Sequence, residues 1–396
     1  LPHLQVGQPL PLARIDADAA MANEHPARRL RVVFQPGLRH GEVDALVTVD
    51  EQDPVSWRLG LDNSGQGSQH GDWRAGLDVQ HASLTGRDDA LSLHVDVPVE
   101  AASDSGALAA RYRWPLASRR WMLEFDAAAS RAGNTRLPTE LGDLNISGGG
   151  AVLGARVIGH LPAVSGWRTQ WSASLDARRM SSRCSLGDFG PEGCGQVQGS
   201  ALLLPLTLGL RAQVDGRFVG SVKASTNLGA GLGEGDAQHL QALRAGASPR
   251  YGVLRSDAAW QQRMGAWQWV VRGAAQYSAQ ALLPAEQMGL GGAQGVRGYA
   301  EREGMGDQGG WLSATLSMGT TWRPSVFADA GVVRRVDGSA CHALSARCQL
   351  ASLGVGLTRE TPQGLALRMD VAQALRGLDT TRRQQWRAHV SLQYTL

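Results

Sequence analysis

The residues best suited to covalent chemistry are four cysteines, which form two close pairs. Cys184 pairs in sequence with Cys194, and Cys341 with Cys348, and each pair lies in a glycine-, serine- and arginine-rich segment typical of a loop. Short pairs of this kind indicate disulfides formed in an oxidising compartment. The alternative, a zinc site built from all four cysteines, fits poorly because neither pair has C-x2-C spacing. The sequence therefore predicts two disulfides and no metal site.

A second candidate is the glycine-rich segment that contains Val296, Arg297, Gly298 and Tyr299. Its glycines suggest nucleotide binding, but it contains no G-x-G-x-x-G motif, and the single lysine, Lys223, is not in a Walker motif. The H-E-x-x-H and G-x-S-x-G signatures of zinc proteases and hydrolases are also missing. We therefore predict no catalytic residues, no cofactor and no enzymatic activity.

Charge and composition exclude further classes of protein. The chain has 39 basic and 36 acidic residues, and its net charge of +3 is too small for a protein that coats nucleic acid. Glycine accounts for 50 of 396 residues and tryptophan for 12, which favours tight turns and interfacial rings. No stretch reaches the ~18 consecutive apolar residues of a membrane-spanning helix. The start at Leu1, without a signal-like segment, indicates a mature form or a fragment.

From residue 56 onward, apolar and polar residues alternate in one segment after another. Alternation over about ten residues, with charged side chains on one face, is typical of a membrane barrel with a wet lumen, although a soluble β-sandwich would alternate in the same way. Sixteen strands are predicted, at residues 56–63, 71–81, 89–97, 105–114, 119–130, 147–160, 165–180, 197–212, 215–228, 248–262, 265–279, 309–322, 325–336, 349–360, 364–373 and 385–396.

The connections between these strands alternate in length, which favours the barrel. Short turns are predicted at 214–216, 263–265, Arg323–Pro324 and 361–364, between longer loops. Short periplasmic turns and long external loops are characteristic of outer-membrane barrels, and both cysteine pairs fall in long loops. Sixteen strands would enclose an aqueous channel, so we expect the longest connection, Gln280–Gln308, to occupy the lumen.

The first 55 residues have a different pattern. A helix is predicted over residues 10–23, followed by strands over 29–35 and 44–50. This α-β-β unit is too small to bury a full core alone and has the pattern of the latter part of a small α/β module. The predicted domains are therefore residues 1–55 and 56–396.

Four segments, in this order along the chain, carry a family resemblance. The first is the end of the module, with Asn23–Pro26, Pro36–Gly37 and Gly41, and the second is the first hairpin, with Gly60–Gly65, Gly71 and Leu84–Asp88. The third is the segment Val296–Tyr299 between strands eleven and twelve, and the fourth is Phe327–Gly331 on strand thirteen. Together they resemble the outer-membrane transporters of two-partner secretion, the TpsB haemolysin secretion/activation family of the barrel-assembly superfamily. The resemblance covers nearly the whole chain.

This resemblance implies an all-β fold, a 16-stranded antiparallel transmembrane barrel preceded by the C-terminal part of a POTRA domain. It also implies that the sixth loop enters the lumen, where Arg297 meets Asp329 within the wall motif of Phe327, Asp329 and Gly331. A guanidinium at a glycine-flanked tip can bind a carboxylate bidentately. In a wet lumen such a pair contributes little to stability, so its expected role is to position the loop. The alternative is that Arg297 is one of many solvated arginines.

The resemblance further implies ATP-independent secretion of a large β-helical exoprotein, of the haemagglutinin/haemolysin or contact-dependent toxin type. The POTRA module, in the periplasm, would recognise the exoprotein's N-terminal secretion domain by strand addition. The other expected partners are outer-membrane lipid and lipopolysaccharide; nucleic acid is not expected, and the chain is expected to be monomeric. An assembly or insertase role in the same superfamily and a passive porin remain open. By comparison with the family, we expect residues 1–55 to contain neither the plug helix, nor the first POTRA domain, nor the start of the second. A further departure is Leu396 at the end of the sequence in place of an aromatic residue.

Overall fold

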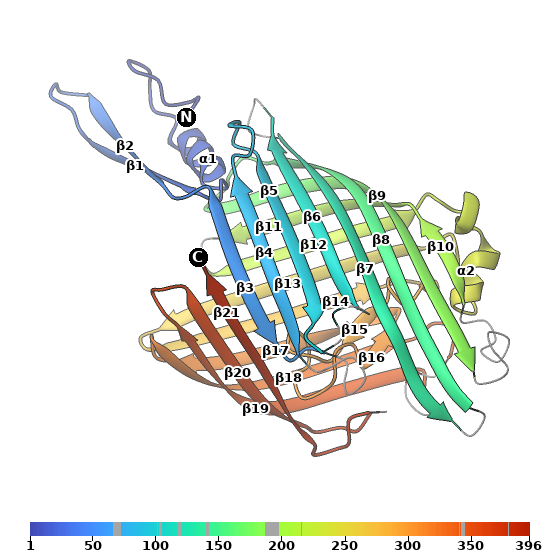
Figure 1. The fold of residues 1–396 in the computed structure, drawn as a ribbon. Helices are drawn as coiled ribbons and strands as arrows, with labels where there is room; N and C mark the ends of the chain where they lie inside the picture. The colour runs from blue at the N-terminus through green and yellow to red at the C-terminus, as the bar shows by residue number, and fades with distance from the viewer. Residues whose placement is uncertain are drawn as a thin grey trace.

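The computed structural model consists of an N-terminal α/β module and a closed antiparallel β-barrel (Figure 1). It describes residues 1–65, 73–100, 102, 105–116, 121–139, 142–186, 198–214, 216–339, 341, 345–378 and 380–396, without the side chains of 133–146 and 186. Within these residues, no helix is long and apolar enough to cross a membrane.

The N-terminal module contains one helix and one hairpin, as the sequence predicts. The helix α1 spans Leu12–Ala22, and the strands β1 (Arg28–Pro36) and β2 (Val43–Glu51) pair along their whole length. The buried face of α1 is formed by Ile15, Asp18 and Ala22, three and four residues apart, which is the spacing of one helix face. The helix thus buries only a few side chains, and most of the hairpin is exposed to solvent.

Charged contacts attach this module to one end of the barrel. The two guanidinium nitrogens of Arg28 each donate to a carboxylate oxygen of Asp88, at 3.0 Å. Asp88 lies in the turn between the second and third barrel strands. A second contact joins Glu24 to His160 and Gln170, with nitrogen to oxygen distances of 2.7 Å in both cases. We call the barrel end that bears these contacts the module end.

Sixteen strands form the barrel wall within the described residues, with β10 and β11 acting as two parts of one strand. The hairpin of β15 (Met288–Leu290) and β16 (Gly304–Gly306) forms a separate sheet. The wall strands are β3 (Val55–Asp62), β4 (Arg74–Ala82), β5 (Ala90–Pro98), β6 (Gly106–Pro115), β7 (Trp121–Thr139), β8 (Gly142–His160), β9 (Trp167–Leu186), β10 (Gly199–Leu203), β11 (Pro205–Val214), β12 (Phe218–Asn227), β13 (Gly252–Met264), β14 (Trp267–Tyr277), β17 (Gln308–Met318), β18 (Trp322–Arg334), β19 (Arg347–Glu360), β20 (Leu365–Ala374) and β21 (Trp386–Thr395). Between β12 and β13 lie the short helices η3 (Gly233–Gly235) and α2 (Ala237–Leu243).

The eighth strand is interrupted where the sequence predicts one continuous strand. The break falls at Leu204, whose backbone N–H donates to the side-chain oxygen of Asn227 on β12 at 2.8 Å instead of to a backbone carbonyl. The next residue, Pro205, has no N–H to donate. The pairing partner is β9 on both sides of the break, so the two parts occupy a single position in the wall.

The turn predicted at Arg323–Pro324 is wrong by a few residues. Both residues lie within β18, where they pair with β19, and the turn occupies residues 319–321. Gly319 has φ of +97°, a left-handed conformation that suits glycine in a tight turn. The first β18 residue that pairs with β17 is Ser325, so the proline precedes that ladder and removes no hydrogen bond from it.

The barrel closes between its last and first strands over a short ladder. Five residue pairs join β21 to β3, from Ser391 with Asp62 to Thr395 with Arg58. Beyond the Ser391–Asp62 pair, the side-chain amide of Asn63 donates to the Ala388 carbonyl at 2.9 Å and accepts from the Val390 N–H at 2.8 Å. A side chain thus extends the bonding across this seam.

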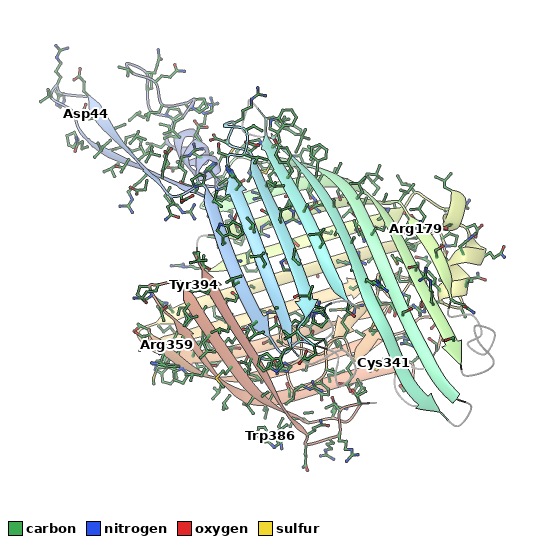
Figure 2. The ribbon with its side chains drawn as sticks, in the orientation of Figure 1. Asp44, Arg179, Cys341, Arg359, Trp386 and Tyr394 are labelled. Carbon is green, nitrogen blue, oxygen red and sulfur yellow. A yellow bond between two sulfur atoms is a disulfide. The ribbon has the colours of Figure 1, made fainter. Side chains whose placement is uncertain are left out.

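Exposed aromatic residues gather at the module end of the barrel. Rings on the outward face at a water–lipid boundary form the aromatic girdle of outer-membrane barrels. Figure 2 shows that Tyr394 and Trp386 lie at opposite ends of β21, and only Tyr394 belongs to this girdle. Its exposed members are Trp57, Trp114, Trp121, Trp167, Trp260, Trp267, Trp269, Trp322 and Tyr394.

Candidate functional site

The candidate site is the connection between β14 and β17, residues 278–307, which we call loop 6. It contains the hairpin β15–β16, which Figure 1 shows close to the wall strands β17 and β18. Contacts join β15 to β17 and β18, and β16 to β18 and β19. The long connection predicted to occupy the lumen therefore packs on the inner face of one part of the wall.

Arg297 lies at the tip of this loop and binds Asp329 on β18. Its Nε and one terminal nitrogen donate to the two carboxylate oxygens, both at 2.7 Å, and its backbone N–H donates to the same carboxylate at 3.0 Å. The arginine side chain is 1% exposed and the aspartate side chain 0%. The structure therefore brings together the two residues, 32 positions apart, whose pairing the family resemblance implies.

The guanidinium of Arg297 has further partners around it. Hydroxyl oxygens of Ser313 and Thr315 accept from it at 3.0 and 3.3 Å, and an Asp370 oxygen lies 3.6 Å away. Its central carbon lies 3.3 Å from the centre of the Phe327 ring, which is a cation–π contact. The site thus supplies acceptors in the plane of the cation and an aromatic face above it.

The pair is buried, and this corrects the expectation that it lies in a wet lumen. A solvated pair loses little when one partner is removed, but a buried partner left alone keeps an uncompensated charge in a low-dielectric site. Because Arg297 and Asp329 are both buried, each depends on the other. The contact therefore holds the loop and also makes its removal costly.

Gly298 allows the tip to approach the wall closely. Its φ is +89°, and a Cβ placed there would lie 3.1 Å from the Cβ of Ala372 on β20. Its N–H donates to Nε2 of His389 on β21 at 3.0 Å. A larger residue would therefore meet both backbone strain and a steric contact at this position.

The neighbours of Gly298 anchor the loop by packing and by hydrogen bonds. Val296 and Tyr299 are both 0% exposed and belong to one apolar cluster. The Tyr299 hydroxyl lies 2.9 Å from the carbonyl oxygens of Ala351 and Arg376, and the backbone N–H groups of these two residues donate to it. One side chain thus fastens the loop to the wall strand β19 and to the connection that follows β20, at the end opposite the module.

Gly331, the last residue of the predicted wall motif, makes room for the hairpin. A Cβ added there would lie 3.1 Å from both terminal carbons of Leu290 on β15. Phe327, Asp329 and Gly331 alternate along β18 and face the same side, so all three contact loop 6. The three predicted wall residues therefore form one surface.

Two carboxylates that the sequence analysis did not identify fasten the base of the loop. Glu303 accepts from the backbone of Ala300 and from the backbone and hydroxyl of Thr381, at 2.6–3.0 Å. Burial raises the pKa of Glu303, but these hydrogen bonds outweigh it and hold that pKa below its ordinary value. The second carboxylate, Asp307, binds Arg244 at 2.6 and 2.9 Å, and Arg244 also binds Asp337.

Asp307 thereby links three barrel connections. It also accepts from the N–H groups of Leu282 and Val336, at 2.9 and 3.0 Å. Burial raises the pKa of Asp307, but the hydrogen bonds from Arg244 and these N–H groups lower it overall. No periodic pattern marks such residues in the sequence, because they belong to irregular segments that meet only in the fold.

Of the two predicted disulfides, the structure describes one completely. Cys341 and Cys348 are joined by a bond of 1.98 Å. Cys184 is disulfide-bonded as well, and Cys194 lies outside the described residues. Within the described part of the chain, no group of three or more His, Cys, Asp or Glu residues is arranged to hold a metal ion.

The family model described as haemolysin secretion/activation protein ShlB/FhaC/HecB matches residues 41–182 and 206–359. No curated relative matches the chain in sequence.

Three solved structures are similar over nearly the whole chain. CdiB from Escherichia coli has a TM-score of 0.80 at 18% identity, over 98% of this chain and 72% of that one. CdiB from Acinetobacter baumannii has a TM-score of 0.71 at 15% identity, over 99% and 70%. BamA from Haemophilus ducreyi lacking POTRA domains 1–3 has a TM-score of 0.62 at 12% identity, over 99% and 80%. At such identities these structures establish the likeness of fold.

Proposed function

The chain belongs to the haemolysin secretion/activation family ShlB/FhaC/HecB, which are outer-membrane transporters of two-partner secretion, and on that premise we propose that it secretes one large β-helical exoprotein. The cargo is of the haemagglutinin/haemolysin or contact-dependent toxin type. The observation that carries the proposal is loop 6, because the Arg297–Asp329 pair places this loop inside the barrel through side-chain contacts that can break and re-form. A connection of this kind can vary how much of the lumen is open.

Cargo recognition is proposed for residues 1–55, as the C-terminal part of a periplasmic POTRA domain. Within the described residues β2 pairs only with β1, so the hairpin has open edges. An extended segment of the exoprotein's N-terminal secretion domain could add to such an edge through backbone hydrogen bonds. The contacts of Arg28 with Asp88 and of Glu24 with His160 would keep the bound segment near the barrel mouth.

Secretion is proposed to need no ATP, because folding of the exoprotein outside the cell would draw the chain outward. Residues 56–396 supply the lumen, the barrel is taken as monomeric, and lipid and lipopolysaccharide surround it. The short turns at the module end, such as residues 265–266 and 319–321, support this orientation in the membrane, with the module on the periplasmic side.

The test is secretion of the exoprotein encoded nearest to the transporter gene. The chain, with its natural N-terminal region, is co-expressed with that exoprotein, and the exoprotein in the medium is measured for wild type, Arg297→Ala and Arg323→Ala. Arg323 lies on the same strand as Asp329 but pairs with the exposed Glu360, so its variant is the matched control.

Secretion that requires the barrel, falls with Arg297→Ala and persists with Arg323→Ala supports the proposal. An inserted barrel that exports nothing contradicts it. In that case, a high constitutive conductance that is the same in wild type and Arg297→Ala indicates a porin. Loss of other outer-membrane proteins when this chain is depleted from cells indicates an assembly factor.

A further inference from the structure

The Cys341–Cys348 disulfide lies against loop 6. Cys348 is the second residue of β19 and is 0% exposed, while Cys341 precedes this strand and is 6% exposed. Figure 2 places Cys341 at the barrel end far from the N-terminal module. The bond is therefore buried although it stands at the edge of the barrel.

The contacts of the disulfide are made with the hairpin β15–β16. A Cβ added at Gly304 of β16 would lie 3.3 Å from the Cβ of Cys348. The sulfur of Cys341 lies 3.6 Å from the carbonyl oxygen of Met305, the next residue of β16. Both cysteines belong to the apolar cluster whose loop 6 members are Met288, Leu290, Val296 and Tyr299.

Cys341 lies outside the wall strands, and the disulfide ties it to one of them. It precedes β19 and belongs to no strand, and its backbone N–H donates to Ser345 at 2.7 Å. The bond to Cys348 connects this segment to the start of a wall strand, where the adjacent Arg347 pairs with Arg334 of β18. The covalent link thus places Cys341 over the hairpin.

We propose that the Cys341–Cys348 disulfide is a positioning element for loop 6, so that the seating of the hairpin depends on oxidation of these two cysteines. Reduction by a dithiol breaks the bond between the two sulfurs. The dithiol gives two electrons and two protons, becomes a disulfide, and leaves two thiols on the chain. Cys341 then moves away from the hairpin, and β16 loses the contact between Met305 and the Cys341 sulfur.

The second disulfide supplies an internal control. Cys184 lies near the end of β9, and it is absent from the cluster that holds loop 6. Its removal with Cys194 deletes the other predicted cross-link of the chain. Any general effect of losing a disulfide should appear in both pairs of variants.

The experiment is hydrogen–deuterium exchange on the full chain in micelles, read by mass spectrometry. We compare wild type, wild type treated with dithiothreitol, Cys341→Ser with Cys348→Ser, and Cys184→Ser with Cys194→Ser. The amides of β15 and β16 should exchange at least about tenfold faster in the dithiothreitol and Cys341/Cys348 samples. The amides of β4 and β5 should be unchanged, and this serves as the check that the barrel is folded.

Reduction of the folded wild type keeps the test valid if the double serine variant does not assemble. Unchanged exchange in β15 and β16 after complete reduction overturns the proposal, and so does an equal effect of the Cys184 and Cys194 substitutions. A third variant, Cys341→Ala with Cys348→Val, keeps an apolar filling without the link. If the amides of β15 and β16 exchange at the wild-type rate in that variant, packing alone holds the hairpin in place, and this also overturns the proposal. None of these outcomes depends on whether the chain secretes an exoprotein.

Discussion

Two parts of the lumen wall share the same alternating sequence pattern but have opposite surroundings. On β17–β20, the inward polar residues lie under loop 6, and Ser313, Asp329, Ser352 and Asp370 are at most 4% exposed. On β4–β6, inward charged residues remain open to solvent, and the side chains of Asp78, His94 and Arg111 are 45%, 46% and 51% exposed. Whether a polar residue that faces inward is buried or solvated therefore depends on whether loop 6 lies over it.

This difference separates two energetic regimes inside one barrel. Under loop 6 a charge interacts with fixed partners at low dielectric, so the loss of one partner is expensive. On the open wall, water screens each pair and replaces lost contacts. The open side includes a hollow of about 410 Å³ lined by Arg58, Asp78 and His94 among others. Substitutions on the two sides should therefore differ greatly in their effect on stability.

The largest effect is expected for Asp329→Ala. This change leaves the guanidinium of Arg297 buried without its main counter-charge, and we expect the free energy of unfolding to fall by about 3–5 kcal/mol. Urea denaturation in micelles measures it. The control is Glu360→Ala, since Glu360 is 63% exposed and its pair with Arg323 contributes at most about 1 kcal/mol. Equal losses in the two variants would remove the proposed distinction between covered and open wall.

A smaller loss is expected for Tyr299→Phe. The ring still fills its place in the apolar cluster, but the carbonyls of Ala351 and Arg376 lose a shared donor, at a cost of about 1–3 kcal/mol. The same denaturation experiment on Tyr394→Phe is the control, because Tyr394 is 38% exposed and should lose almost nothing. A Tyr299→Phe protein as stable as wild type would show that packing, rather than the hydroxyl, anchors the loop.

The sequence predicted the barrel well because period-two alternation is a local signal. It predicted the helix and hairpin of the module for the same reason. The positions of Arg297 and Asp329 followed from a family resemblance, and the close approach at Gly298 from the glycines around it. Their burial did not follow, because alternation shows which face a side chain occupies and not what covers that face.

Contacts between irregular segments were beyond sequence reasoning. Asp307 and Arg244 are 63 positions apart and have no periodic context, so nothing in the sequence relates them. The break at Leu204 was missed for a similar reason, because it involves a hydrogen bond that the Leu204 N–H donates to the side chain of Asn227, 23 positions away. The turn near Pro324 was misplaced because proline marks both turns and the first residues of strands.

Acid should loosen the base of loop 6 through Glu303. Its pKa is held below the ordinary 4.5, so its contribution to stability is fully present above pH 4.5 and is lost as the pH falls through the lowered pKa. Exchange of the β16 amides should therefore accelerate below about pH 4.5, after correction for the intrinsic pH dependence of exchange. In Glu303→Gln the acceleration should be smaller, because the carboxylate is absent at every pH. An identical acid response in both proteins would assign the effect to other groups.

The smallest effect on stability, and a distinct effect on function, is expected on the open wall. Asp78→Asn removes the charge that faces His94 across β4 and β5, with a nitrogen to oxygen distance of 2.8 Å. Because both side chains are nearly half exposed, the free energy of unfolding should change by at most about 1 kcal/mol. Water reaches this wall, so the lost negative charge should instead lower the preference of the pore for cations, measured as a shifted reversal potential in planar bilayers. A large loss of stability with no change in selectivity would show that this wall is covered, and the contrast between the two sides would then fail.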